Sequence, residues 1–432
     1  MLFKHTWAFL LLVILGVLFR LGFVLAADSR QLTFHSGGSD APVYALLAEN
    51  LLLHKGFTYA GQPSAFRPPG YPSLLAGFME VFGHHYITAV RVLQFIVGLL
   101  TVVTCATIAR RIFGREGQRA TLVFGLYLPT LIFSTAQLMT ECVSTFLTAL
   151  FLLFLVEQQE RGDGRSACGL GLIAGLESLM RFNAAILPFF ALGAVIGGRR
   201  KGSVVLRSAA VMLLAALVVL PWMIRNASVF PGHVLYATHT GANAVQGVVN
   251  TEGRTQPGDT EKLKAAMGWC VQDLETNDSA RLALPSETDL NRHALRVVPQ
   301  LWREQGWNAV PLLAKKIADF WLSTDQFLHT QSLPATERAI RIAGVSLYWI
   351  VVAVAMGGLH HLRKTRPDLA AWVILYLVGI TLVHLPFVMN TRLRIPLVEP
   401  LIIVLAGGGW VRLDYLIRHR HQDPDLPVAV AE

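Results

Sequence analysis

Two acidic residues are candidates for chemistry because of where they fall between the apolar runs of this 432-residue sequence. Asp40 ends the segment Gly37-Gly38-Ser39-Asp40, directly before a stretch with helical periodicity. A carboxylate fixed at a helix start can take a proton from a hydroxyl nucleophile, which is the task of a general base. The alternative is a plain N-cap that contributes about 1 kcal/mol to the helix. Asp40 alone fits both interpretations.

Glu141, in Met139-Thr140-Glu141, is the second candidate catalytic residue and stands at the start of an apolar run. It could serve as a second acid or orient an acceptor, and the alternative is an interfacial acid near lipid headgroups. An ionised side chain at the middle of a bilayer costs roughly 2.5–3.5 kcal/mol on insertion scales. Acids beside apolar runs therefore mark function or lie near the interface.

Arginines that could hold an anionic group accompany these acids, namely Arg67, Arg181, Arg392 and Arg394. Guanidinium pairs bidentately with phosphate, so the set suits a phosphate-bearing lipid. The alternative is that the last three only snorkel to headgroups. Arg67 lies in Phe66-Arg67-Pro68-Pro69-Gly70-Tyr71-Pro72, whose prolines form a stiff, non-helical turn. That turn can hold Arg67 at a phosphate or serve only as a rigid connection.

The elements that must position these residues are apolar helices. Hydrophobic residues make up 53% of the chain and charged residues only 15%, against roughly 25% charged in soluble domains. We predict an all-α polytopic membrane protein with about ten spans, the first retained rather than cleaved as a signal peptide. The expected spans are 7–27, 86–108, 120–135, 138–156, 167–180, 183–198, 208–225, 340–360, 369–388 and 395–411.

The distribution of basic residues predicts the orientation of the spans. With the N-terminus in the cytoplasm, four cytoplasmic loops collect most of the Lys and Arg. We expect an N-terminal membrane module (1–225) with a first external loop (28–85), an extracytoplasmic part (226–338) and C-terminal membrane helices with a short tail (339–432). Helices over 39–56 and 309–322 would lie at the membrane surface. The candidate acids and arginines all then lie toward the outer face.

Several kinds of site have no sequence support. The net charge of +9 reflects loop residues that orient helices, so nucleic acid is not expected as a partner. The sequence contains no nucleotide-binding glycine loop and no Cys/His zinc pattern. The histidines His84, His85, His233 and His239 do not show metal-ligand spacing and are expected to be structural or exposed. A single polar-segment thiol, Cys270, implies no disulfide framework.

Taken together, these residues resemble the GT-C class of membrane glycosyltransferases, in particular the family that includes protein O-mannosyltransferases and the bacterial lipid A aminoarabinose transferase. The resemblance covers about the first 250 residues and the last 50. It rests on Asp40 followed by Tyr44 and Ala48, the Arg67 to Pro72 motif, Glu141, Met180-Arg181-Phe182, the motif Pro221 to Asn226, and Thr391-Arg392-Leu393-Arg394-Ile395-Pro396.

The resemblance implies a GT-C fold, a polyprenyl-phosphate sugar donor and an inverting transfer with Asp40 as the catalytic carboxylate. Arg67, Arg181 and Arg392 or Arg394 would hold the lipid phosphate, and Tyr44 and Tyr71 would line the substrate site. No cofactor is implied with certainty, and a divalent cation stays an open alternative. Two departures, Ala41 after Asp40 and Glu141 where relatives often have Asp, weaken an assignment to protein mannosylation.

The expected partners are therefore a polyprenyl-phosphate sugar, membrane lipids and an extracytoplasmic acceptor, which could be a glycolipid, a cell-envelope glycan or a protein. The expected location is a bacterial-type cytoplasmic membrane with the active site on its outer face. The alternative from another class is a flippase for a lipid-linked sugar. Transporters tend to show repeated halves and polar groups near the midplane, and this sequence shows neither clearly. A third hypothesis is an inactive scaffold that only binds polyprenyl lipids.

Overall fold

The computed structural model describes residues 6–26, 40–197, 203–230, 234, 236–249, 287–322, 335–389 and 391–418. Expectations for Gly37, Gly38, Ser39, His233 and Cys270 lie outside these residues. The elements are α1 (Thr6–Ala26), α3 (Ala41–Leu52), β1 (Thr58–Tyr59), β2 (Gln62–Pro63), α4 (Gly70–Phe82), η1 (Gly83–His85), α5 (Tyr86–Tyr127), α6 (Pro129–Ala136), α7 (Glu141–Arg161), α8 (Gly164–Met180), η2 (Phe182–Ile186), α9 (Leu187–Gly197), α10 (Val204–Val229), α11 (Thr240–Val249), α14 (Glu287–Gln305), η4 (Gly306–Asn308), α15 (Ala309–Leu322), α16 (Ala335–Thr365), α17 (Pro367–His384) and α18 (Thr391–Arg418).

Seven helical stretches among the described residues are long and apolar enough to cross a membrane. They are α1, the continuous stretch of α4 and α5, α7, α10, α16, α17 and α18. The remaining predicted spans fall on α6, α8 and α9, which are shorter. The prediction of an all-helical, multi-pass membrane protein is confirmed, whereas the number of about ten spans is not.

The boundary expected between the second and third spans is a sharp turn inside α5. Two helices meet there at Gly114, whose φ of +72° and ψ of −167° are not helical and suit glycine. The chain turns back at this point, because a Cβ on Gly125 would lie 2.9 Å from the side chain of Val102, whereas 23 residues of one continuous helix span roughly 35 Å. The predicted span 120–135 is instead divided at Leu128, where Pro129 starts α6 and cannot continue the preceding helix.

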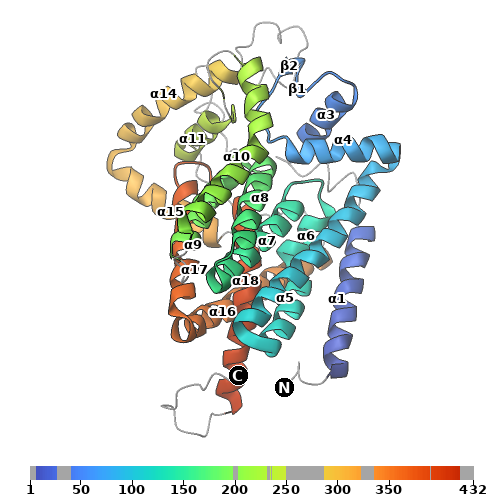
Figure 1. The fold of residues 1–432 in the computed structure, drawn as a ribbon. Coiled ribbons are helices and arrows are strands. Elements are labelled where there is room, and N and C mark those ends of the chain that lie inside the picture. The colour runs from blue at the N-terminus through green and yellow to red at the C-terminus, as the bar shows by residue number, and fades with distance from the viewer. Residues whose placement is uncertain are drawn as a thin grey trace.

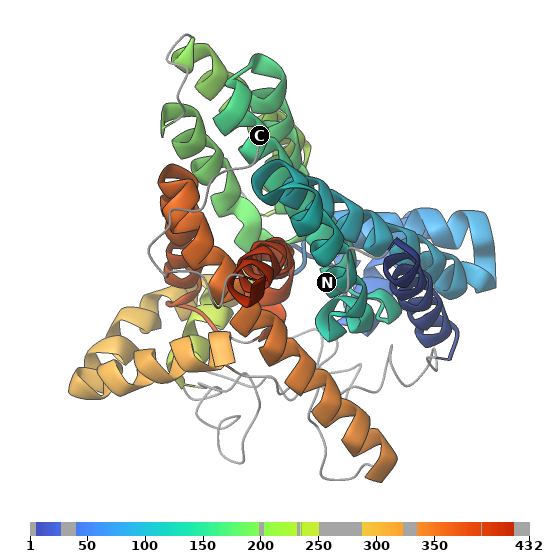
Figure 2. The same cartoon turned by 90° about the horizontal axis from the view of Figure 1, so that it is seen from below.

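Helix α18 lies at the centre of the bundle, where it packs against α5, α7 and α16 (Figure 2). Every residue from Arg394 to Gly409 is buried. Its crossing with α16 is close because both helices carry glycine at the contact. A Cβ on Gly358 would collide with the carbonyl of Leu405, and one on Gly409 would collide with the carbonyl of Val354. Small residues of this kind allow helix backbones in membranes to approach closely.

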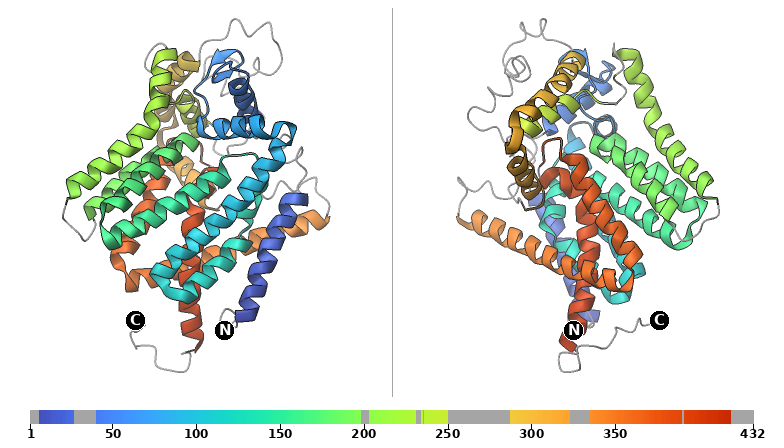
Figure 3. Two further views of the ribbon diagram at one scale, coloured as in Figure 1. Left: turned by 45° about the vertical axis from the view of Figure 1, so that its right-hand side comes forward. Right: turned by 90° about the vertical axis from the view of Figure 1, so that its left-hand side faces the viewer.

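The elements outside the bundle gather at the end opposite the start of α1 and the end of α18 (Figures 1 and 3). The expected surface helix over 39–56 is α3, which stops at Leu52, and the expected helix 309–322 is α15. A two-stranded antiparallel hairpin, Thr58 opposite Pro63, was not predicted. Its tight turn uses positive φ at Ala60 and Gly61. This end of the bundle therefore carries both polar parts of the chain.

A buried lysine fastens one of these parts to the bundle. The Lys316 ammonium on α15 donates hydrogen bonds to the carbonyls of Gly247 (2.8 Å) and Leu385 (2.6 Å), and it lies 5.6 Å from the ring of Trp302. The two carbonyls belong to the C-terminal ends of α11 and α17, where unpaired carbonyls attract a cation. Burial lowers the pKa of Lys316 to about 8.

Replacing Lys316 with methionine is expected to lower the free energy of unfolding by about 2 kcal/mol, because two buried carbonyls lose a charged donor. The adjacent Lys315 is the matched control, since it is 43% exposed and pairs with Asp319 at 3.6 Å. Lys315→Met should change stability by less than about 0.5 kcal/mol. Thermal unfolding in detergent measures both variants, and equal midpoints would contradict the prediction.

Candidate active site

Five of the predicted residues form one chain of alternating charges, which we call the arginine–carboxylate cluster (Asp40, Arg67, Glu141, Arg181 and Arg392). Arg392 bridges the two acids, with Nη2 2.6 Å from Asp40 Oδ2 and Nε 2.5 Å from Glu141 Oε1. Arg67 pairs with the other oxygen of Asp40. Arg181 Nη1 lies 3.3 Å from Glu141 Oε1. Each carboxylate is thus shared between two guanidinium groups.

Helix ends place these side chains together. Glu141 is the first residue of α7, Arg181 follows the last residue of α8, and Arg392 is the second residue of α18. Asp40 stands directly before α3, and Arg67 lies just before the Pro69 N-cap of α4. Termini that meet at one end of a bundle bring residues together that are up to 352 positions apart. The acid at the start of α7 also suits the positive end of the helix dipole.

The structure does not support the N-cap interpretation of Asp40. The residue occupies the N-cap position of α3, yet its side chain makes no capping hydrogen bond and points to the arginines instead. Burial by itself would raise the pKa of Asp40, but Arg392 and Arg67 outweigh burial and hold that pKa below its ordinary value. Asp40 is therefore an ionised carboxylate that two arginines hold in place.

The two acids differ in how solvent reaches them. The side chain of Asp40 is 18% exposed, while that of Glu141 is 4% exposed. Arg181 is also buried and donates a hydrogen bond to Thr140 Oγ1 (2.7 Å). Among the described residues, Glu141 Oε2 and the Nε atoms of Arg67 and Arg181 are buried without a hydrogen-bond partner. The cluster is thus open to solvent at Asp40 and closed at Glu141. Three of its polar atoms are free to make a further hydrogen bond.

Tyr44 lies one helical turn after Asp40, and its ring lies next to that of Tyr71, with ring centroids 5.4 Å apart in an edge-on arrangement. Both are buried, and the Tyr71 hydroxyl donates to Gln94 Oε1 (2.7 Å). Gln94 in turn donates to the carbonyl of Gln137 (2.7 Å), which lies in the connection before Glu141. The Tyr71 hydroxyl is therefore directed at Gln94, which links it to the connection before Glu141.

Arg394 does not join the cluster. Its guanidinium donates to the carbonyl of Trp321 (2.6 Å), lies 3.3 Å from Glu399, and covers the ring of Tyr348 at 5.2 Å. It is fully buried between α15, α16 and α18. Either Arg392 or Arg394 was expected to hold the lipid phosphate. Of these two, the structure places only Arg392 beside Asp40.

One residue at this site was not predicted. His239, expected to be structural or exposed, lies with its ring centroid 5.1 Å from Phe182 and 5.7 Å from Phe66. These phenylalanines directly follow Arg181 and precede Arg67 in the sequence. Adjacency to two candidate arginines was a signal for the phenylalanines, whereas no sequence signal linked His239 to them.

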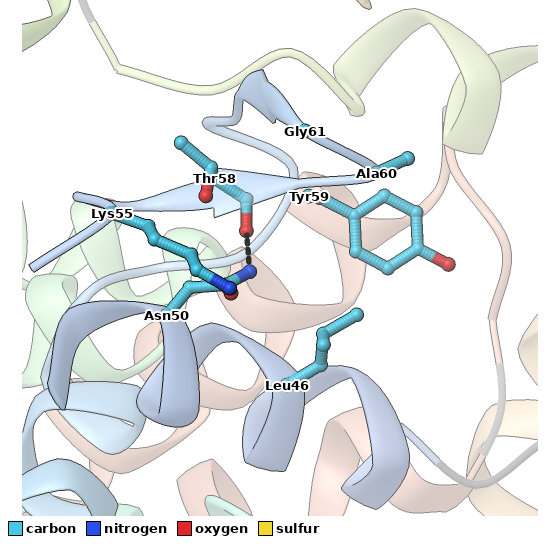
Figure 4. A pocket seen from close by; sticks show the side chains of 7 residues that line it. All are labelled: Leu46, Asn50, Lys55, Thr58, Tyr59, Ala60 and Gly61. Carbon is cyan, nitrogen blue, oxygen red and sulfur yellow. Dashed lines mark hydrogen bonds between the residues drawn. The ribbon is translucent and has the colours of Figure 1, made fainter. Parts of the chain in front are cut away.

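Two further features bear on ligands. Within the described ranges, no group of three or more His, Cys, Asp or Glu side chains is placed to hold a metal ion. A cavity of about 510 Å³ lies between α3 and the hairpin, lined by Leu46, Asn50, Lys55, Thr58, Tyr59, Ala60 and Gly61 (Figure 4). Asn50 Nδ2 donates to the Thr58 carbonyl across it (2.9 Å). None of the predicted site residues lines this cavity.

Comparison with known proteins gives the class of the chain. A family model described as dolichyl-phosphate-mannose-protein mannosyltransferase matches residues 66–224, a stretch that includes Arg67, Glu141 and Arg181. Fold and match together define a multi-pass membrane protein with the GT-C fold of membrane glycosyltransferases. A search of curated proteins finds no match.

Among solved structures, the chain is similar to the oligosaccharyltransferase AglB from Archaeoglobus fulgidus in complex with an inhibitory peptide and a dolichol-phosphate. The identity is 15% and the TM-score 0.55, covering 100% of this chain and 53% of that one. For the apo form of the Archaeoglobus fulgidus enzyme the identity is 13% and the TM-score 0.55, covering 97% of this chain and 52% of that one. For ArnT from Cupriavidus metallidurans bound to undecaprenyl phosphate the identity is 14% and the TM-score 0.43, covering 96% of this chain and 81% of that one. The chain thus spans about half the length of the archaeal enzyme, and the likeness concerns the fold.

Proposed function

We propose that this chain transfers a sugar from a polyprenyl-phosphate donor to a hydroxyl of an extracytoplasmic acceptor, with inversion at the anomeric carbon. The observation that carries the proposal is Arg392 bridging Asp40 and Glu141 at 2.6 and 2.5 Å. This bridge places a partly open carboxylate directly beside guanidinium groups. Such a pair supplies the two functions that the transfer needs, a base for the acceptor and cations for the leaving phosphate.

The charge of the cluster matches the donor. Three guanidinium groups and two carboxylates leave one positive charge on the arginine–carboxylate cluster. A polyprenyl-phosphate sugar is a phosphodiester with one negative charge, and the polyprenyl phosphate released from it gains a second. Arginines already in place as that charge grows would stabilise the transition state more than the bound donor.

The reaction proceeds as one displacement. The acceptor oxygen attacks the anomeric carbon while the bond from that carbon to the phosphate oxygen breaks, which inverts the configuration. Asp40 takes the proton of the acceptor hydroxyl, and polyprenyl phosphate leaves toward the arginines. Donor phosphate would draw Arg67 and Arg392 away from Asp40. Because these arginines are what lower the pKa of Asp40, their transfer to phosphate would make the carboxylate a better base.

Glu141 is assigned a positioning role in this scheme. It is nearly inaccessible and holds Arg392 and Arg181 from the closed side of the cluster. A buried carboxylate between two guanidinium groups fixes their direction and offsets their mutual repulsion. Asp40 is accordingly the carboxylate assigned to the acceptor, and Glu141 the one that orients the arginines.

The location of the cluster supports a transferase over a flippase. Its five residues stand at helix ends on one end of the bundle, away from the midplane where transporters hold their substrates. Charge distribution in the loops assigns that end to the outer face of a cytoplasmic membrane. The archaeal oligosaccharyltransferase of the same fold was solved with a dolichol-phosphate, which is also a polyprenyl-type phosphate.

The proposal is tested with purified protein in nanodiscs, membrane extract as the source of acceptor, and a panel of undecaprenyl-phosphate-linked mannose, glucose, galactose and aminoarabinose. We expect the protein to consume one of these donors and to release undecaprenyl phosphate in step with glycosylated product. Consumption of none would contradict the proposal. Movement of an intact donor between the leaflets of proteoliposomes, without release of undecaprenyl phosphate, would favour the flippase.

A further inference from the structure

We infer that His239, together with Phe66 and Phe182, forms a subsite for the sugar ring of the lipid-linked donor. The inference rests on the proposed function and extends it, because it assigns to the external part of the chain a direct contact with substrate. The three residues are called the aromatic subsite below.

The aromatic subsite is built onto the arginine–carboxylate cluster. The rings of Phe182 and His239 are stacked at 5.1 Å with 29° between their planes, and Phe66 meets His239 edge-on at 5.7 Å. The guanidinium of Arg67 lies over the Phe66 ring at 4.6 Å. Each phenylalanine is the sequence neighbour of a cluster arginine, so a group bound at those arginines has the aromatic rings beside it.

Hydrogen bonds fasten His239 at this position. The backbone amide of Thr238 donates to the carbonyl of Ala65 (3.2 Å), which joins the segment before α11 to the segment before Arg67. Glu287 Oε2 at the start of α14 accepts from the Thr238 hydroxyl (2.6 Å) and from the Ala65 amide (3.0 Å). Three segments that are distant in the sequence thus meet at the carboxylate of Glu287. His239 is the next residue after Thr238, so this junction holds it in place.

The chemistry of His239 favours a hydroxylated ligand. Within the described part of the chain, its Nδ1 is buried and has no hydrogen-bond partner. Burial, and then the charge of Arg67, lower the pKa of His239 to about 3, so the ring is neutral near pH 7. A neutral imidazole has one donor and one acceptor nitrogen, which suits a hydroxyl that both donates and accepts. A phosphate would gain nothing from the acceptor nitrogen.

The position of the subsite selects the sugar ring of the donor. In a polyprenyl-phosphate sugar the ring is one bond from the phosphate, and the arginines beside the subsite are those proposed to hold that phosphate. Flat aromatic side chains offer apolar area for the C–H face of a pyranose, with a polar group at the edge for a hydroxyl. The subsite combines both features.

The test compares binding of two lipids to wild type and to His239→Phe in detergent, in the absence of acceptor. The probes are undecaprenyl phosphate and the undecaprenyl-phosphate sugar that wild type binds most tightly in the panel above. His239→Phe keeps an aromatic ring and loses both nitrogens. We expect its affinity for the sugar lipid to fall about tenfold and its affinity for undecaprenyl phosphate to stay within about twofold.

Two further variants make the outcome decisive. His239→Gln keeps a hydrogen-bonding group and should lose less sugar-lipid affinity than His239→Phe, which separates a polar contact from a packing defect. His54→Phe, at an exposed turn, should change neither affinity. Equal losses for both lipids, or no loss for either, would overturn the inference while the proposed function stands. Failure of wild type to bind any sugar lipid would overturn both.

Discussion

Replacing Asp40 with asparagine is expected to reduce sugar transfer by at least about a hundredfold while leaving the protein folded. Asparagine has nearly the same shape as aspartate and can still accept a hydrogen bond from Arg392. It cannot take a proton from the acceptor hydroxyl. Release of undecaprenyl phosphate, followed with the donor that wild type consumes, measures the loss. Affinity for the donor should fall much less than the rate of transfer.

Asp163 provides a matched control for this prediction. It also precedes a helix, but its Oδ1 accepts a capping hydrogen bond from the amide of Ser166 (2.9 Å). Asp163→Ala should therefore cost about 1 kcal/mol of stability and leave transfer unchanged. Full activity of Asp40→Asn would show that the base lies elsewhere, and Glu141 would be the next residue to replace. Loss of folding in Asp40→Asn would instead assign Asp40 a structural role.

Replacing Arg392 with glutamine is expected to affect both stability and activity, because Arg392 is the residue that joins the two acids. Glu141 would keep Arg181 at 3.3 Å but lose its shorter partner, and Asp40 would keep Arg67. We expect a loss of about 3 kcal/mol in the free energy of unfolding, the usual scale for breaking a buried ion pair. Transfer should fall by at least about a hundredfold.

A double variant separates these two effects. Arg392→Gln combined with Glu141→Gln removes both members of the 2.5 Å pair, so its loss of stability should be smaller than the sum of the losses in the two single variants. Activity should not return, since the leaving phosphate still lacks its arginine. Arg111→Gln serves as the control at the other end of the bundle, where Arg111 is partly exposed and pairs with Glu157 and Glu160. Its substitution should cost less than about 1 kcal/mol. Recovery of transfer in the double variant would contradict the role of Arg392.

The arginine–carboxylate cluster shows which parts of a site a membrane sequence can reveal. Apolar runs located the helices, and the distribution of loop arginines set the candidate residues at one end of them. Ionised groups are costly inside a bilayer, so those beside apolar runs had to face one another or the interface. For Asp40, Arg67, Glu141, Arg181 and Arg392 this reasoning led to residues that lie together in the structure.

The sequence did not predict features that depend on the direction of a side chain or on contacts between segments distant in the chain. Consecutive helical residues are rotated by about 100°, so Arg392 and Arg394 must point to different sides of α18. Only the packing of α18 against its neighbours decides which of them meets Asp40. The sharp turn at Gly114, which joins two expected spans, likewise depends on a backbone conformation that neither hydropathy nor length encodes.

The sequence by itself thus determined a multi-pass helical membrane protein with acids and arginines at one end, because solvent transfer energies act on each segment separately. The tertiary structure decided what those residues do to one another. It turned Asp40 away from capping α3 toward two arginines, buried Glu141 behind Arg392, and brought His239 beside Phe66 and Phe182. These contacts join segments distant in the chain, so only the folded packing of the helix ends could establish them.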